Sequence, residues 1–424
     1  MKKYMTVWAI VASGLIGTGW ITGKVEAKKV VEREETSCEA CENDVSCMLE
    51  AHPEMVCGVG LANEPTIQIA LLLDTSSSMN GLINQAKSQL WSIVNQCALA
   101  QKDGVRPRLE VALFEYGNSG LPATEGYIRQ VVPFTSNLDQ FSAALFALST
   151  NGGDEYCGQV MNEALSRLAW HGGNRTYRAI YIAGNEPFTQ GSVPYQEVCQ
   201  RAKGRNVIVN TIHCGPYDTG VSGMWQHGAA LAGGKYMNIN QDRQVVHIAT
   251  PYDDVILQKN KALNDTYVWF GAGAPEAKMM QEREDSNAAG MGKSVAVQRA
   301  QTKSSAMYSQ SGHDLVDTME EDKDALKKVK VADLPEEMQG MKDEERSEFI
   351  IEKAKERAEI QAEISELNVK RNAYIAEKRK AEVNENTNTL GDAILKAVQE
   401  QLVGVGFEIK KEQAASEENE VIVE

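Results

Sequence analysis

The fold of this 424-residue chain is decided by the stretch Ile67-Gln68-Ile69-Ala70-Leu71-Leu72-Leu73-Asp74-Thr75-Ser76-Ser77-Ser78-Met79. Its apolar part is short enough for a strand and continuous enough to be buried on both faces, as in a parallel sheet. The loop that follows carries one carboxylate and two hydroxyls at alternate positions, namely Asp74, Ser76 and Ser78. Ligands bind at this edge of an open α/β sheet. Hard oxygen donors of this kind suit Mg²⁺, Ca²⁺ or Mn²⁺.

Strand and helix patterns alternate after this stretch, which predicts a doubly wound, mostly parallel sheet over residues 64–250. Pro133 removes a ladder donor from the strand that contains it, so this strand is expected at an edge of the sheet. The remaining strands are expected at 109–116, 178–183, 206–215 and 233–239. Helices are expected at 81–102, 138–148, 195–202 and 225–232, with a further helix that ends at Leu168.

Asp-x-Ser-x-Ser, placed after a buried strand and before a long amphipathic helix, resembles the metal-ion-dependent adhesion site of von Willebrand factor type A domains. The resemblance implies that Asp74, Ser76 and Ser78 hold a divalent cation, with Mg²⁺ favoured over Ca²⁺ and Mn²⁺. The alternative is that these serines only cap the following helix, as Ser often does.

A second loop of that family supplies a Thr, or an Asp after Gly-Gly, to the cation. In the segment Thr150-Asn151-Gly152-Gly153-Asp154-Glu155-Tyr156-Cys157-Gly158, Asp154 is the better match and Thr150 the weaker one. The alternative is that these carboxylates only favour the first turn of the next helix.

At the third loop most members of the family have Asp-Gly, but this chain has Gly184-Asn185-Glu186. We expect Asn185, or more weakly Glu186, to reach the cation directly or through water; otherwise the site is weakened or lost. Segments 151–158, 183–188 and 210–215 together resemble a bacterial family of exported von Willebrand A proteins, and that resemblance extends into parts of the C-terminal region.

The N-terminus predicts export. Lys2 and Lys3 precede a largely apolar stretch, and a small-residue cleavage site ends at Ala27, so residues 1–27 are interpreted as a signal peptide. The alternative is an uncleaved membrane anchor. Both interpretations place the body of the protein outside the cytoplasm, in the periplasm or secreted.

Eight cysteines in an exported chain favour disulfides. The first four lie in a Cys-rich extension, residues 28–63, and their spacing favours two disulfides over a zinc knot. Their pairing stays open: Cys38, Cys41, Cys47 and Cys57 allow three combinations. Cys199 and Cys214 are candidates for a further pair.

The C-terminal part is predicted to be helical. A helical extension and linker covers 251–333, a long helix followed by a shorter one covers 334–411, and a disordered acidic tail covers 412–424. A heptad seam in the long helix, formed by Ile360, Ile364, Leu367, Arg371 and Tyr374, indicates either a self-associating coiled coil or an arm packed on its own domain.

The net charge of −16 argues against nucleic acid as a partner. No nucleophile with an adjacent base is apparent, so the sequence favours a non-enzymatic binding protein. In this hypothesis the cation completes its coordination with a carboxylate or another oxygen from a partner protein. The alternatives are a metal-free envelope scaffold with a degenerate site and, less favoured, a hydrolase.

Overall fold

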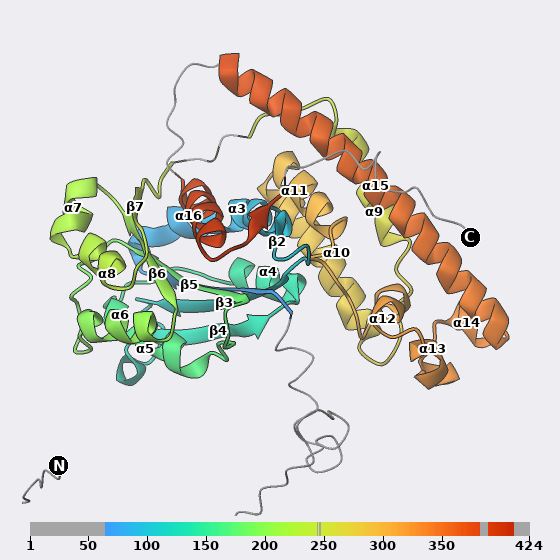
Figure 1. Cartoon of the computed structure of the whole chain (residues 1–424), viewed down its shortest axis with the longest axis horizontal. Helices are drawn as coiled ribbons and strands as arrows, with labels where there is room; N and C mark the ends of the chain where they lie inside the picture. Colours follow the sequence, from blue (N-terminus) through green and yellow to red (C-terminus); the bar gives the residue numbers. More distant parts are fainter. Residues whose placement is uncertain (1–63, 244, 246, 382–388, 411–424) are drawn as a thin grey trace, which may run out of the picture. The chain divides into compact units, whose positions relative to one another are not determined.

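The computed structural model describes residues 64–243, 245, 247–381 and 389–410. A six-stranded sheet has the order β4-β3-β1-β5-β6-β7, and all its pairings are parallel except the one between β3 and β4 (Figure 1). Its strands are β1 (Thr66–Asp74), β3 (Arg108–Tyr116), β4 (Ile128–Thr135), β5 (Thr176–Gly184), β6 (Ile208–Cys214) and β7 (Tyr236–Ile239). The predicted doubly wound, mostly parallel sheet is therefore confirmed.

Strand β4 is the edge strand that Pro133 predicts. Its pairing with β3 is antiparallel, and the register shifts between Val111 and Leu113, whose partners are Thr135 and Val132. A bulge thus falls where Pro133 cannot donate a ladder hydrogen bond.

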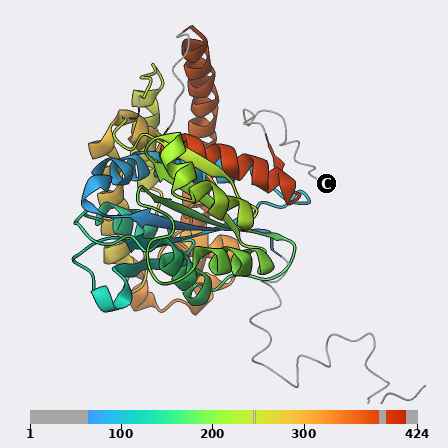
Figure 2. The same cartoon turned by 90° about the vertical axis from the view of Figure 1, so that its left-hand side faces the viewer.

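Helices cover both faces of the sheet, because side chains of the central strand alternate between them (Figure 2). Ile67, Ile69 and Leu71 of β1 join one core, whereas Ala70 and Leu72 join the other. The first core includes α3 (Asn80–Ala98) and α4 (Leu138–Phe146), and the second includes α5 (Cys157–Arg167), α6 (Tyr195–Gly204) and α8 (Trp225–Leu231), which follows the short α7 (Tyr217–Ser222).

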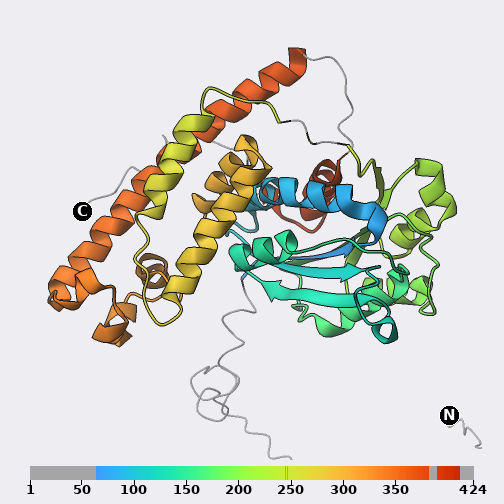
Figure 3. The ribbon, with the colours of Figure 1, turned by 180° about the vertical axis from the view of Figure 1, so that it is seen from behind.

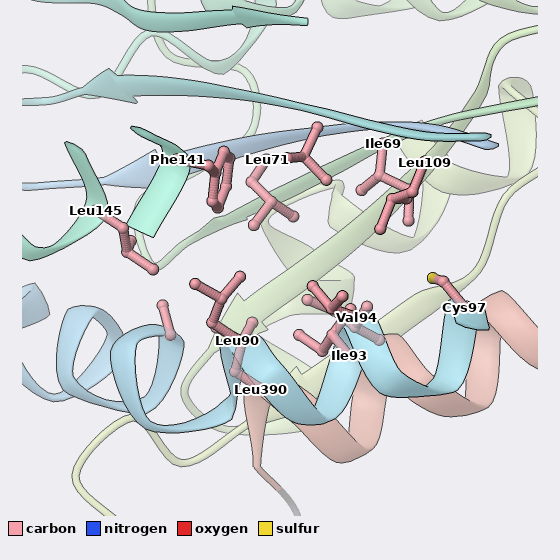
Figure 4. A pocket seen from close by; sticks show the side chains of 13 residues that line it. Ile69, Leu71, Leu90, Ile93, Val94, Cys97, Leu109, Phe141, Leu145 and Leu390 are labelled. Atoms are coloured by element: carbon pink, nitrogen blue, oxygen red, sulfur yellow. The ribbon is translucent and has the colours of Figure 1, made fainter. Parts of the chain in front are cut away.

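The short helix α16 (Leu390–Gly404) returns to the sheet domain and completes the first core. Leu390 lies beside Leu90 and Ile93 of α3 in an apolar cavity under the sheet (Figure 4). The backbone N–H of Leu390 donates to Gln85 Oε1 at 2.8 Å. Beyond the helix, β8 (Glu408–Ile409) pairs with β2 (Ala100–Gln101). Residues 240–389 are therefore inserted between the last strand of the sheet and a helix of the same core.

The inserted segment is helical, and none of the described helices is long and apolar enough to cross a membrane. The inserted helices are α9 (Asp253–Asn264), α10 (Ala274–Met291), α11 (Lys293–Lys303), α12 (Leu315–Glu321), α13 (Ala325–Lys328), α14 (Glu336–Gln339) and α15 (Asp343–Ala381). Helix α10 packs on α4, and α9 runs along α15 (Figure 3). The predicted helical extension and linker, residues 251–333, thus contains the five helices α9 to α13.

The heptad seam of α15 faces the chain itself. Ile360 and Ile364 are buried in the first core, and Arg371 Nε donates to Asp253 Oδ1 of α9 at 2.9 Å. The predicted alternative, an arm packed on its own domain, therefore describes this seam.

Buried ion pairs fasten the insertion to the sheet domain. Arg299 of α11 is buried, and its guanidinium lies 2.7 Å from Asp139 of α4 and 2.5 Å from Asp285 of α10. Lys303 lies 2.9 Å from the same Asp285 carboxylate. A buried pair is costly to break because the remaining charge is left uncompensated.

The disulfide suggested for Cys199 and Cys214 is not formed, because the two residues lie on opposite faces of the sheet. Both are buried free thiols, as are Cys97 and Cys157. Cys38, Cys41, Cys47 and Cys57 lie outside the described residues, as do the signal segment and the acidic tail.

Candidate metal centre

The first loop begins where the central strand ends. Asp74 is the last residue of β1 and is fully buried. Its Oδ1 accepts a hydrogen bond from the Ser76 backbone N–H at 2.7 Å, and the hydroxyls of Ser76 and Ser78 are 3.3 Å apart. The Ser76 side chain makes no capping hydrogen bond to the turn that follows. The three oxygen-bearing side chains therefore gather at one point, and the simple capping alternative does not account for Ser76.

The third loop meets the first because β5 is the parallel neighbour of β1. Asn185 follows β5 directly, and its Nδ2 donates to Ser78 Oγ at 3.1 Å. Asn185 therefore lies beside the first loop, and its role as a cation ligand stays a prediction.

Tyr116 explains why the third loop carries Gly184 and no aspartate. A Cβ on Gly184 would overlap the Tyr116 hydroxyl and would lie 3.1 Å from Asp74 Oδ2. That hydroxyl donates to the Ala183 carbonyl at 2.9 Å and is buried. The space that a side chain would need is therefore filled from β3.

The second loop brings Glu155 to the site, while Asp154 and Thr150 make other contacts. Asp154 is exposed and accepts a hydrogen bond from the Tyr156 hydroxyl at 3.1 Å, and the Thr150 hydroxyl donates to Asn80 Oδ1 at 2.7 Å. Glu155 is only 8% exposed, and its backbone N–H donates to Gln190 Oε1 at 2.9 Å. Of the two adjacent carboxylates, Glu155 is therefore the buried one, and Asp154 and Thr150 stay predicted ligands that make other contacts in this structure.

The two buried carboxylates are difficult to ionise together. Burial raises the pKa of Asp74 to about 6, although hydrogen bonds from Ser76 lower it in part. Burial also raises the pKa of Glu155 to about 7, with further increases from the negative charges of Asp74 and Glu186. Glu186 itself is half-buried and acts on both carboxylates through space. A cation would relieve this repulsion.

The donor atoms at the site fit a hard divalent cation. Within the described residues, Asp74 Oδ2 and Asn185 Oδ1 are buried without a hydrogen-bond partner. Carboxylate, amide and hydroxyl oxygens are the ligands that Mg²⁺ and Ca²⁺ prefer. No three His, Cys, Asp or Glu side chains of the described segments group closely enough to hold a metal. A cation here would therefore also depend on Ser and Asn oxygens.

Sequence reasoning missed Tyr116 and Gly117, and it did not assign Glu155 to the cation. Gly117 has a φ of +79°, and a Cβ on it would lie 2.8 Å from Glu155 Cγ and 2.9 Å from Asp74 Oδ1. The signal available was the glycine that directly follows the second strand at its carboxyl end, the edge where ligands bind.

The fold and site define the class: an α/β protein with an Asp-x-Ser-x-Ser loop at the carboxyl end of its central parallel strand. Residues 68–221 match the model of the von Willebrand factor type A domain, and this segment is such a domain. No curated protein sequence matches the chain.

Solved structures of similar proteins have low identity. Conserved hypothetical protein BatB from Bacteroides thetaiotaomicron is 17% identical, with 41% of this chain and 90% of that chain covered and a TM-score of 0.32. An aerotolerance-related membrane protein from Bacteroides fragilis is 14% identical, with 42% and 93% covered and a TM-score of 0.29. Proximal thread matrix protein 1 from the mussel byssus, with a zinc-occupied metal-ion-dependent adhesion site, is 12% identical, with 42% and 43% covered and a TM-score of 0.32.

Proposed function

We propose that this chain is an exported, non-enzymatic binding protein that holds a divalent cation, with Mg²⁺ favoured, at Asp74, Ser76, Ser78 and Asn185. A protein partner adds a carboxylate or another oxygen to the open side of the cation. Von Willebrand A domains are typically protein-interaction modules that often bind a divalent cation, which supports this assignment. Export rests on the N-terminal sequence.

One observation carries the cation proposal. The oxygens Asp74 Oδ2 and Asn185 Oδ1 lie at the carboxyl ends of the adjacent parallel strands β1 and β5 and are buried without hydrogen-bond partners within the described residues. An unsatisfied buried oxygen costs about 1–3 kcal/mol, and more if it is charged. Coordination of a cation removes this cost at both oxygens.

The test is calorimetric titration of the metal-free protein with Mg²⁺, Mn²⁺ and Ca²⁺, beside the variant Asp74→Ala. We expect binding in the wild type and none in the variant, whose secondary structure is checked by circular dichroism. A concentration of Mg²⁺ 100 times Kd should raise the free energy of unfolding by about 2.7 kcal/mol. Absence of binding in the folded wild type would favour a metal-free scaffold, the function that the missing third-loop aspartate suggests.

A further inference from the structure

We infer that Glu155 is the second protein carboxylate of the cation site and takes the place of the aspartate that Gly184 lacks. The inference rests on the cation proposed above and identifies a ligand that the motif does not contain. It also implies that the domain holds the cation without a partner.

The position of Glu155 is fixed by the first two strand ends. The point where Gly117 would carry a Cβ lies 2.8 Å from Glu155 Cγ, 2.9 Å from Asp74 Oδ1 and 3.6 Å from Ser76 Cβ. The Glu155, Asp74 and Ser76 side chains therefore converge on the space beside Gly117, and only a glycine at that position leaves room for them.

The second loop is held in place by its backbone. The Asn151 N–H donates to the Thr75 carbonyl at 2.9 Å, so the second loop is attached to the first. Gln190, from the segment after the third loop, accepts from the Glu155 N–H. These bonds direct Glu155 inward, whereas Asp154 turns outward to Tyr156.

A ligand is indicated independently by Asp74. Its Oδ2 is fully buried and has no hydrogen-bond partner in the described part of the chain, and the buried Glu155 side chain lies on the same side of Gly117 as Asp74 Oδ1. Two carboxylates buried together repel each other when both are ionised, and a cation shared between them removes that repulsion. Their charges would balance a divalent ion, so a partner's oxygen is an additional ligand and is not needed for neutrality.

The test is Mn²⁺ binding to the metal-free full chain, measured by calorimetry and by the loss of the free Mn²⁺ electron paramagnetic resonance signal. Glu155→Gln should weaken binding about 10- to 100-fold, the effect of losing one charge-assisted contact. Asp154→Asn is the matched control, because it removes the neighbouring carboxylate, and it should change Kd less than about twofold. Thermal unfolding of each metal-free variant confirms that it is folded.

The variant Glu155→Asp separates ligation from charge. It keeps the negative charge but shortens the side chain by one methylene, so binding should weaken measurably if the carboxylate coordinates the ion. Wild-type affinity in Glu155→Asp or Glu155→Gln, with binding lost in Asp74→Asn, would overturn the role of Glu155 and leave the cation site intact. Absence of Mn²⁺ binding in the wild type would overturn both.

Discussion

The exclusion of a side chain at position 184 by Tyr116 gives a quantitative prediction. Gly184 is not among the glycines with positive φ, so alanine meets no backbone strain there. The obstacle is the Tyr116 hydroxyl, which the new Cβ would overlap. Overpacking of this kind costs about 1–3 kcal/mol, so Gly184→Ala should lower the free energy of unfolding by that amount.

The double-mutant cycle with Tyr116→Phe isolates this contact. Tyr116→Phe alone loses the hydrogen bond to the Ala183 carbonyl, a cost of about 1–2 kcal/mol. Because the phenyl ring lacks the overlapping oxygen, Gly184→Ala should cost about 1–2 kcal/mol less in the Tyr116→Phe background. Urea unfolding of the four metal-free proteins measures each free energy, and unchanged m-values would show that the denatured state is not altered.

An equal cost of Gly184→Ala in both backgrounds would refute the reasoning, because the hydroxyl would then not be what excludes the side chain. If the coupling is found, Gly184→Asp combined with Tyr116→Phe should restore a third-loop carboxylate. That protein should bind Mn²⁺ more tightly than Tyr116→Phe alone, which calorimetric titration can measure.

Other contacts give further predictions. Ile394 lies on the buried face of α16, so Ile394→Ala should lower the free energy of unfolding in urea by about 2–5 kcal/mol. Val403→Ala, at a residue of the same helix that is 59% exposed, should lower it by less than about 0.5 kcal/mol. Similar losses in the two variants would contradict the packing of α16. Ile364→Glu, in the α15 seam, should greatly lower the melting temperature, and Ile351→Glu, 63% exposed, should not. The pKa of Asp285 is raised by burial, but Lys303 and Arg299 outweigh burial and lower it to about 2 from 3.8. The ionised Asp285 therefore stabilises the fold above pH 4, and this stabilisation is lost as the pH falls to 2. The loss of unfolding free energy caused by Asp285→Asn should accordingly shrink by about 2 kcal/mol between pH 4 and pH 2. A difference between wild type and variant that does not change with pH in urea unfolding would refute this prediction.

The sheet could be predicted from the sequence because each strand is indicated by the residues of its own segment. The apolar run before Asp74 has the pattern of a doubly buried strand, and Pro133 marks an edge wherever it falls in a strand. Both features act on their own segment, so no knowledge of distant residues was needed.

The site could be predicted only in part, because two of its features depend on residues far apart in the chain. Gly184 is interpretable from the sequence as a lost ligand, but the reason lies in Tyr116, on another strand. Asp154 and Glu155 are adjacent carboxylates, and the backbone of the second loop decides which one turns inward. Neither composition nor residue spacing indicates which of the two side chains points inward.

The surface on which α16 packs could not be predicted from the sequence either. Its apolar face, with Ile394 and Val398, fits many surfaces equally well. The match with α3 depends on Gln85 and Gln89, whose side chains bond to Leu390, Gly391 and Thr389 at sequence separations of up to 305 residues. Patterns within one helix do not specify a partner at that distance.

The return of α16 also has a consequence for biosynthesis. One face of the sheet keeps exposed apolar surface until residues beyond 389 have been synthesised, so the domain cannot finish folding while its own strands emerge from the ribosome. Contacts of such large sequence separation are slow to form, because the loop-closure entropy is lost before the contacts are gained. The early part of the chain therefore stays incompletely folded until synthesis is nearly complete.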